Sequence, residues 1–465
     1  MIRRLLIRGG EVDGRPADVR IYGERVAAVA PALSPTPAED VIEAGGGALL
    51  PGLVDHHLHL FALAAAERSV LCGPPRVSDA VALADALRGA RGDRHGWVRG
   101  IGYHESVAGD LDTSALDRLH ADRPVRIQHR SGAMWMVNSG AAARLGIASA
   151  NHPGIERHGD GSPTGRLWRA DDWLRSRLPA EPPADLAEVG TGLARLGITS
   201  VTDATPDLDR NAVASIAEAA RTGALPQRVQ LLGAPLDAEL PDGIISGPYK
   251  IVLADSGLPD LDELVGRIAA ARAAGRAVAV HCVSREALVL LLAALDEVGH
   301  RPDDRIEHAA LVPAQLVGEL GRRGLRIVTQ PGFLADRGDD YLRDVPVVDH
   351  ADLYRCRSLL DAGARLALSS DAPYGPVDPW AVMAAAVRRD TRGGATVSAA
   401  ERLDPAAALA AYLAPSDDPG GAPRRVRAGA AADLVLLDRP LVAVLANPQV
   451  DAVRGVIVKG HWMAR

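Results

Sequence analysis

Two histidines stand two residues apart at the end of an apolar run, in the sequence PGLVDHHLH (51–59). Because alternate side chains of a β-strand point to the same side, His57 and His59 would share one face. Two imidazoles on one face can supply half of a zinc-type metal site. A pair of polar surface histidines has the same spacing, so the pattern predicts a metal only if further ligands lie at the same place.

Three more side chains of metal-binding type end later apolar runs. His281 follows AVAV, His308 ends RIEH, and Asp371 ends RLALSSD. A single histidine after an apolar run is more often a hydrogen-bonded structural residue than a ligand. A buried carboxylate, however, needs a cation or hydrogen-bond donors to offset its desolvation. Two such histidines on separate strands, together with this carboxylate, favour a metal site.

Lysine is rare in this chain, since Lys250 and Lys459 are the only lysines among 52 basic residues. Lys250 lies in another apolar run, GPYKIVLAD. Arginine cannot be deprotonated in proteins whereas lysine can, so a retained lysine points to amine chemistry. A neutral amine and CO₂ form a carbamate, an anionic oxygen ligand that can bridge two metal ions. The alternative is an ordinary ion pair with Asp255.

Eight apolar strands with amphipathic helices between them would position these residues. Strands alternating with helices predict parallel β/α units. Eight such units fit an α/β fold of the closed (β/α)₈ TIM-barrel type, with its chemistry at the C-terminal ends of the strands. An open doubly wound sheet fits the alternation too, although no glycine-rich nucleotide motif follows any strand. The predicted strands span 48–59, 198–203, 228–233, 249–255, 277–283, 305–311, 326–332 and 365–371.

Short strand-like runs occupy both ends of the chain. We therefore predict a small composite β-sandwich from residues 1–47 and 425–465, and a metal-dependent barrel from residues 48–424. The stretch from about 60 to 184 breaks the β/α alternation. We interpret it as an insertion over the barrel mouth, where insertions shape substrate pockets.

Together, these motifs resemble the amidohydrolase superfamily, and in particular amidohydrolase family 3 with its N-substituted formamide deformylase-like branch. The resemblance covers most of the chain and implies a (β/α)₈ barrel with a composite β-sandwich. It also implies one or two divalent metal ions, often zinc, and hydrolysis of a C–N bond. Besides PGLVDHHLH, the strand lysine, RIEH and SSDAP, it rests on GIGYHES, WMVNSG, GDGSPTGRL, VTDAT, TQPGF and AGAAADLVLLD with VRGVIVKG.

The resemblance implies a role for each ligand. His57, His59 and Asp371 would bind the more buried metal ion. His281 and His308 would bind the second, and a carboxylated Lys250 would bridge the two. Because a bound metal lowers the pKa of water to about 7, hydroxide would be available to attack the carbonyl. Asp371 would act as the general base and then as the general acid.

Three positions depart from the family pattern. His56 stands where relatives commonly have a small polar residue. On a strand its side chain would point away from His57, so we place it outside the metal site. It is nevertheless the nearest alternative imidazole to the predicted ligands. A GD pair follows the strand-5 histidine in many relatives, but here Cys282-Val283-Ser284 follows it. The usual insertion histidine before W-x-N-S is out of register, and His129 is the candidate substitute.

Candidate substrate-binding residues come from the insertion, from the end of the seventh strand and from the region after it. Aromatic and imidazole groups commonly line small-molecule pockets, so Trp135 and His104 are the first to test. The full set is Tyr103, His104, Glu105, His129, Arg130, Trp135, Asn138, Gln330 and Arg337.

Composition restricts the partners. The net charge of −7, the pI of about 6.1 and the scattered arginines give no basic face for nucleic acid. No apolar run reaches the roughly 18 residues of a membrane span. We expect a small-molecule substrate, with a homodimer as the candidate assembly. An odd cysteine count without a C-x-x-C pair, and no signal-peptide pattern, predict a cytoplasmic protein; the cysteines are Cys72, Cys282 and Cys356.

Three other functions compete with amide hydrolysis. Heterocycle deaminases on this fold usually have a glutamate three residues after the strand-5 histidine, where this chain has Ser284. A lactonase or other esterase would use the same metal site. A non-catalytic barrel scaffold would have lost metal ligands, and all six are present.

Overall fold

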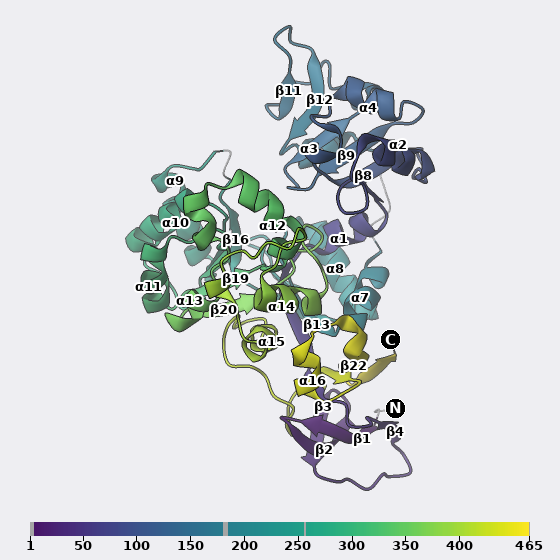
Figure 1. Cartoon of the computed structure of the whole chain (residues 1–465), viewed down its shortest axis with the longest axis vertical. Helices are drawn as coiled ribbons and strands as arrows, with labels where there is room; N and C mark the ends of the chain where they lie inside the picture. Colours follow the sequence, from purple (N-terminus) through teal and green to yellow (C-terminus); the bar gives the residue numbers. More distant parts are fainter. Residues whose placement is uncertain (1–3, 180–184, 255–256, 465) are drawn as a thin grey trace. The chain divides into compact units, whose positions relative to one another are not determined.

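The computed structural model describes residues 4–179, 185–254 and 257–464. Its packing divides the chain into two compact units, which are described separately (Figure 1). The main unit comprises Met1–Leu60 and Asp185–Arg465, and the insert unit comprises Phe61–Ala184. Among the described residues, no helix combines the length and apolar character needed to cross a membrane.

Two parallel sheets form the centre of the main unit, so this part of the chain is α/β as predicted. Several of their strands, including β13 and β19, are buried at every position, as expected for parallel strands covered on both faces. The first sheet has the order β15 (Ile244–Ser246), β14 (Arg228–Leu231), β13 (Ile198–Asp203) and β6 (Leu53–Leu58). The second has the order β16 (Tyr249–Val252), β17 (Val278–Cys282), β18 (Arg305–His308), β19 (Arg326–Thr329) and β20 (Arg365–Leu368).

Each of the eight predicted strands contains one of these strands, and β15 was not predicted. The predicted strand 249–255 extends to Asp255, which lies outside the described residues, as does the suggested ion pair between Asp255 and Lys250. Backbone hydrogen bonds join the two sheets beyond the strand ends. Asp371 donates to the His57 carbonyl at 2.8 Å, and His59 donates to the Ala372 carbonyl at 2.9 Å. On the other side, the Lys250 amide donates to the Leu232 carbonyl at 3.1 Å.

Helices follow most of the strands, and Figure 1 shows α9 to α11 and α13 outside the second sheet. Their starts are capped by side chains that accept a backbone N–H, as in Asp260 before α9 and Ser284 before α10. Gly223 and Gly324 end two of them in the left-handed conformation that glycine tolerates. The helices are α7 (Leu186–Arg195), α8 (Arg210–Thr222), α9 (Leu261–Ala273), α10 (Arg285–Val298), α11 (Ala314–Arg323), α12 (Gly332–Asp344), α13 (Arg357–Asp361), α14 (Pro379–Arg388), α15 (Pro405–Leu413) and α16 (Leu441–Ala446).

Both ends of the chain form four-stranded sheets whose apolar faces share one cluster of buried side chains, drawn from residues 5–49 and 426–457. Strand β3 meets the C-terminal segment directly, since the Val26 amide donates to the Ala430 carbonyl at 2.9 Å. One sheet has the order β3 (Arg25–Ala30), β2 (Arg15–Tyr22), β1 (Arg4–Val12) and β4 (Asp40–Glu43). The other has the order β23 (His461–Ala464), β22 (Val453–Val458), β21 (Leu434–Leu437) and β5 (Leu49–Pro51).

The prediction of one strand over 48–59 was wrong, because the chain changes sheet at Gly52. Strand β5 pairs with β21 in the end sheet, whereas β6 pairs with β13 in the central sheet. A Cβ atom built on Gly52 would lie 2.1 Å from the Thr199 hydroxyl oxygen. Only glycine lets the backbone pass this close at the crossing point.

The insert unit contains a six-stranded sheet of its own. The Pro/Gly/His-rich passage 151–165, for which no strand was predicted, contains β11 and part of β12, an antiparallel hairpin closed by the His158 amide donating to the Ser162 carbonyl at 2.8 Å. The helices of this unit include α2 (Ala80–Gly89), α3 (Glu105–Ala108), α4 (Thr113–Leu119), α5 (Ser139–Leu145) and α6 (Asp171–Arg177). The sheet has the order β11 (Ile155–Arg157), β12 (Pro163–Trp168), β10 (Met134–Val137), β9 (Val125–His129), β8 (Val98–Tyr103) and β7 (Val70–Leu71).

Candidate metal centre

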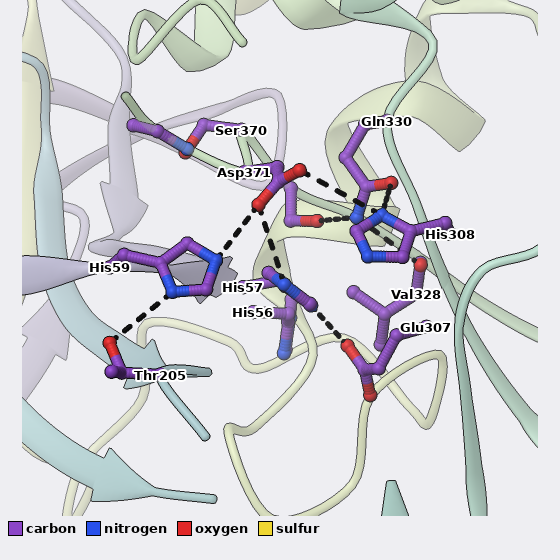
Figure 2. A network of polar contacts seen from close by, with 12 residues as sticks. His56, His57, His59, Thr205, Glu307, His308, Val328, Gln330, Ser370 and Asp371 are labelled. Atoms are coloured by element: carbon purple, nitrogen blue, oxygen red, sulfur yellow. Dashed lines mark hydrogen bonds and ion pairs between the residues drawn. The ribbon is translucent and has the colours of Figure 1, made fainter. Parts of the chain in front are cut away.

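Three ligand-type side chains of the main unit come together between β6 and β20. The ligand atoms of His57, His59 and Asp371 all lie within 4.8 Å of one another. Asp371 Oδ1 is 3.1 Å from His59 Nε2 and 3.5 Å from His57 Nε2. Figure 2 shows the carboxylate of Asp371 between the two imidazoles and the ring of His308. This cluster has the donor types that bind zinc in proteins.

The other three predicted ligands lie beside this cluster. Lys250 on β16 places Nζ 3.5 Å from His57 Nε2. The His308 ring, at the end of β18, is 4.8 Å from the His57 ring and 4.5 Å from the His281 ring, measured between centroids. His308 Nδ1 is also 3.9 Å from Asp371 Oδ2. The six side chains predicted as ligands are therefore neighbours, although they come from five different strands.

The backbone is strained where two of these side chains leave their strands. His308 has a φ of 70° and Asp371 a φ of 54°, both in the left-handed region. Non-glycine residues held in such regions cost about 1–3 kcal/mol each and are concentrated at functional sites. His308 is the last residue of β18 and Asp371 lies three residues beyond β20, and both side chains lie close to His57.

His57, His59 and His308 each have a partner on the Nδ1 atom. His57 Nδ1 bonds the Glu307 carboxylate, His59 Nδ1 lies 3.2 Å from the Thr205 hydroxyl, and His308 Nδ1 lies 2.9 Å from Gln330 Oε1. The Gln330 amide donates to Ser369 Oγ at 2.9 Å and to the Val328 carbonyl at 3.3 Å (Figure 2). Partners of this kind orient metal-binding histidines and fix which nitrogen carries the proton.

The protonation of His57 indicates that the cluster suits a cation. An ionised carboxylate only accepts hydrogen bonds, so the bond that Glu307 accepts from His57 requires the proton of His57 to be on Nδ1. His57 Nε2 then carries a lone pair that faces Asp371 Oδ1 at 3.5 Å. Two acceptors that face each other in a buried place need a positive charge between or beside them. Lys250 Nζ is close enough to supply one, and a divalent ion would fit the same donor set.

Burial sets the charge of these groups. It lowers the pKa of both His57 and His308 well below the usual range, and the positive charge of Lys250 adds to the effect. Both rings are therefore neutral, which is the form that binds a metal. Burial also lowers the pKa of the Lys250 ammonium, although Glu307 and Asp371 oppose the shift. Burial alone would raise the pKa of Glu307, but the charges of Arg305 and Lys250 reverse this and the net shift is downward.

In the described part of the chain, Asp55 and His56, which precede His57 on β6, make no contact with the His57–His59–Asp371 side chains that would add a metal ligand. Asp55 accepts the amides of His57 at 3.1 Å and Ser370 at 3.2 Å, and burial raises its pKa to about 6. It thus ties the end of β6 to the segment after β20. The His56 ring is fully buried and directed away from Asp371 in Figure 2, as the alternation of a strand predicts. Neither of its ring nitrogens has a hydrogen-bond partner among the described residues.

Two candidate substrate residues lie in the main unit. Gln330 is fully occupied by its bonds to His308, Ser369 and Val328. Arg337 on α12 lies 4.7 Å from the centre of the Phe333 ring and donates to the carbonyl of Tyr374. The ring of Tyr374 in turn lies 5.4 Å from that of His59, so Arg337 is linked to the cluster through one residue.

The other candidate substrate residues lie in the insert unit, and three of them have all their polar side-chain atoms engaged there. The Tyr103 hydroxyl donates to the Gly109 carbonyl, and Trp135 Nε1 donates to Asp171 at 2.8 Å. The Asn138 amide makes four hydrogen bonds, to the backbone of His120, Arg123, Val125 and Ala141. Packing and capping account for these three side chains.

A second group of these residues forms a polar cluster around Glu105. Its Oε2 atom is 3.2 Å from His129 Nε2 and 3.6 Å from His104 Nε2. Each imidazole accepts on Nδ1 the backbone amide of the serine two residues later, Ser131 or Ser106. This acceptor role puts the proton on Nε2, where it points at Glu105. Arg130 follows at the end of β9 and is half-buried.

Glu307 and Arg305 were not predicted as site residues, although both belong to the RIEH motif that contains His308. Both side chains are almost completely buried. The sequence did contain a signal for them, because two opposite charges stand two residues apart within an apolar strand. Charged side chains are almost never fully buried unless they are paired. Thr205, in the VTDAT motif, was not predicted as the partner of His59, because no feature of the sequence links the two residues.

Known proteins resemble the whole of this chain. The model of the amidohydrolase family matches residues 40–463. An N-substituted formamide deformylase of Arthrobacter pascens is 26% identical over 87% of this chain and 85% of its own length. An uncharacterised metal-dependent hydrolase of Pyrococcus horikoshii OT3 has a similar fold, with a TM-score of 0.74 at 20% identity over 99% of this chain and 100% of that one. The N-isopropylammelide isopropylaminohydrolase of Burkholderia multivorans ATCC 17616 has a TM-score of 0.56 at 18% identity over 98% of its chain and all of this one.

Proposed function

The chain belongs to the amidohydrolase family and is a hydrolase acting on C–N bonds, and from this premise we propose that it cleaves an amide-type bond of a small molecule at the His57–His59–Asp371 cluster. The observation that carries the proposal is the convergence of their ligand atoms within 4.8 Å. The formamide deformylase of Arthrobacter pascens, which is similar over most of its length, favours an amide or formamide substrate.

We assign the ligands as follows. One divalent ion, which we propose to be zinc, would be held by His57, His59 and Asp371. A second would be held by His281 and His308, with Lys250 as a carboxylated bridge. Two features support the role of Lys250, namely the 3.5 Å between its Nζ and His57 Nε2 and the downward shift of its pKa. The neutral amine that burial favours is the form that reacts with CO₂.

The bound metal would supply Lewis acidity, which polarises a carbonyl group and acidifies water. Asp371 would do the proton transfer. Its Oδ1 atom faces the two histidine Nε2 atoms, so Oδ2 is the oxygen left to accept a proton from water and pass it to the leaving nitrogen. The hydrogen bonds that Asp55 accepts from the backbone at His57 and Ser370 would keep this carboxylate aligned with the histidines.

A deaminase is the nearest alternative, and one contact argues against it. Ser284 stands where those enzymes usually have a glutamate, and its hydroxyl caps α10 by accepting the Ala287 amide at 3.2 Å. An esterase or lactonase would use the same metal-binding and acid–base groups. The substrate panel described below distinguishes it from an amide hydrolase. The presence of all six ligand-type side chains in one place argues against a non-catalytic scaffold.

The fold proposal is a closed (β/α)₈ barrel over residues 48–424 with a composite β-sandwich from residues 1–47 and 425–465. The backbone hydrogen bonds that join β6 to the segment after β20, and β16 to the residue after β14, support closure, and the shared apolar cluster of the end sheets supports the sandwich. We further propose that the insertion at about 60–184 covers the barrel mouth and carries substrate contacts from His104, Glu105, His129 and Arg130. The odd number of cysteines, without a C-x-x-C pair, supports a reducing, cytoplasmic location.

Metal removal and a substrate panel test the proposal together. We expect the dialysed enzyme to hydrolyse members of an N-formyl, N-acyl and cyclic-amide panel, to lose this activity with dipicolinate, and to regain it with Zn²⁺. Full activity in the chelator would contradict the metal assignment. Turnover of lactones alone would contradict the C–N assignment, and ammonia release from heterocycles alone would favour the deaminase.

A further inference from the structure

Glu307 and Arg305 form a buried ion pair behind His57. Arg305 Nε donates to Glu307 Oε1 at 2.6 Å, and Nη2 donates to Oε2 at 3.0 Å. The same Nη2 donates to the backbone carbonyl of His56 at 2.9 Å. Arg305 is 1% exposed and Glu307 is 0% exposed, and both belong to β18. The pair therefore joins β18 to β6 at the level of the proposed metal site, across 250 residues of sequence.

The hydrogen bonds of Glu307 define what it can do. Oε1 is taken by Arg305, and Oε2 is shared between Arg305 and His57 Nδ1. The two donors from arginine hold the carboxylate in one orientation, as is typical of this bidentate geometry. Its oxygens face the Nδ1 side of the ring, whereas Asp371 and Lys250 lie 3.5 Å from Nε2. Glu307 is thus placed to hold the ring and not to bind a metal itself.

The three histidines differ in the strength of their Nδ1 partners. His57 bonds a charged carboxylate, whereas His59 has a hydroxyl at 3.2 Å and His308 a neutral amide oxygen at 2.9 Å. Hydrogen bonds to ionised groups are roughly twice as strong as those between neutral groups. A carboxylate on Nδ1 also increases the basicity of Nε2 and so the strength of its bond to a metal.

We propose that Glu307, oriented by Arg305, is a positioning residue that makes His57 a stronger metal ligand than His59 or His308, by keeping its proton on Nδ1 and leaving its Nε2 lone pair on the side of Asp371. This rests on the proposed function, since it assumes that His57 binds a metal ion. The inference extends the proposed function, because it assigns a role in metal binding to an ion pair that could otherwise be a purely structural link between β18 and β6.

Measured Zn²⁺ affinity distinguishes a positioning role of Glu307 from a purely structural role of its ion pair. We would compare the full-length chain with Glu307→Gln and Glu307→Ala by competition with a chromophoric chelator, and follow the visible spectrum of the Co²⁺-loaded forms. Loss of such a partner typically costs about 10- to 100-fold in metal affinity. We expect a loss in this range for Glu307→Ala, a smaller loss for Glu307→Gln, and a shifted Co²⁺ spectrum in both. Thr205→Val, which removes the weaker partner of His59, should cost less than Glu307→Ala.

Glu401→Gln is the matched control. Glu401 is also a buried carboxylate in an ion pair, 2.9 Å from Arg355, and it bonds Ser358 instead of a histidine. We expect it to lower the melting temperature but to leave Zn²⁺ affinity unchanged. Wild-type affinity in folded Glu307→Gln and Glu307→Ala, or an equal loss in Glu401→Gln, would overturn the inference. If the alanine variant does not fold, Glu307→Gln, which conserves volume, decides alone. A wild-type chain that binds no Zn²⁺ would overturn the proposed function itself.

Discussion

We expect Asp371→Asn to lower kcat by about 10²- to 10⁴-fold, the range typical of losing a general acid–base group. Asparagine keeps the shape of the side chain and one oxygen near His59, where Asp371 Oδ1 now lies at 3.1 Å. It cannot carry the proton from water to the leaving nitrogen. The loss should therefore fall on kcat more than on KM, as steady-state kinetics on the best substrate of the panel would measure.

Asp304→Asn is the control for this variant. Asp304 is as buried as Asp371, but it precedes β18 and pairs with Arg272 at 2.7 Å, at the opposite end of the strand from His308. Its loss should reduce stability and leave kcat unchanged. A kcat for Asp371→Asn within a few-fold of wild type would show that this carboxylate does not transfer the proton.

The second large effect is expected at Lys250. Lys250→Ala should reduce activity by more than about 100-fold, because a lost bridging ligand should cost more than the 10- to 100-fold typical of its outer partners. Acetate or propionate should restore part of the activity, since a small carboxylate can enter the space left by the carbamate. Steady-state assays with increasing acid concentration would measure the rescue.

The chain offers one matched control, because Lys459 is its only other lysine. Lys459 follows β22 in the end sheet, where its backbone amide donates to Asp433 at 2.7 Å. Lys459→Ala should keep wild-type activity and respond to neither acid. An active Lys250→Ala variant with full metal content would mean that Lys250 is not a ligand.

The parallel strands other than β15 were predictable because each lies in a short, largely apolar run. His281, His308 and Asp371 stand at or just beyond the ends of β17, β18 and β20, where the alternation of strands and helices led us to expect chemistry. Composition alone also drew attention to Lys250. These signals are local, and they do not depend on which strands pair.

The contacts that hold the ligands were not predictable, because they join residues far apart in the sequence. Nothing near His57 in the chain indicates that its Nδ1 meets Glu307, and nothing in VTDAT indicates that Thr205 meets His59. The break at Gly52 was hidden for the same reason, since it is imposed by Thr199 in another strand. Turn geometry was likewise hard to infer for the hairpin within residues 151–165.

Sequence patterns were least informative about substrate-binding residues in the insertion. Aromatic and amide side chains were chosen there as pocket candidates, yet those of Tyr103, Trp135 and Asn138 are committed to bonds within their own unit. Whether a polar side chain is free for substrate depends on which backbone groups reach it, and that is set by packing. The cluster of His104, Glu105 and His129 remains our proposal for substrate contact from this unit.

Metal analysis of the dialysed protein tests the central claim most directly. The account predicts at least one transition-metal ion per wild-type chain, and loss of that ion in His57→Ala with the fold retained by circular dichroism. His56→Ala is the paired control, because that ring points away from the cluster and should not affect metal content. Full metal occupancy in His57→Ala, or a wild-type chain without metal, would contradict the account.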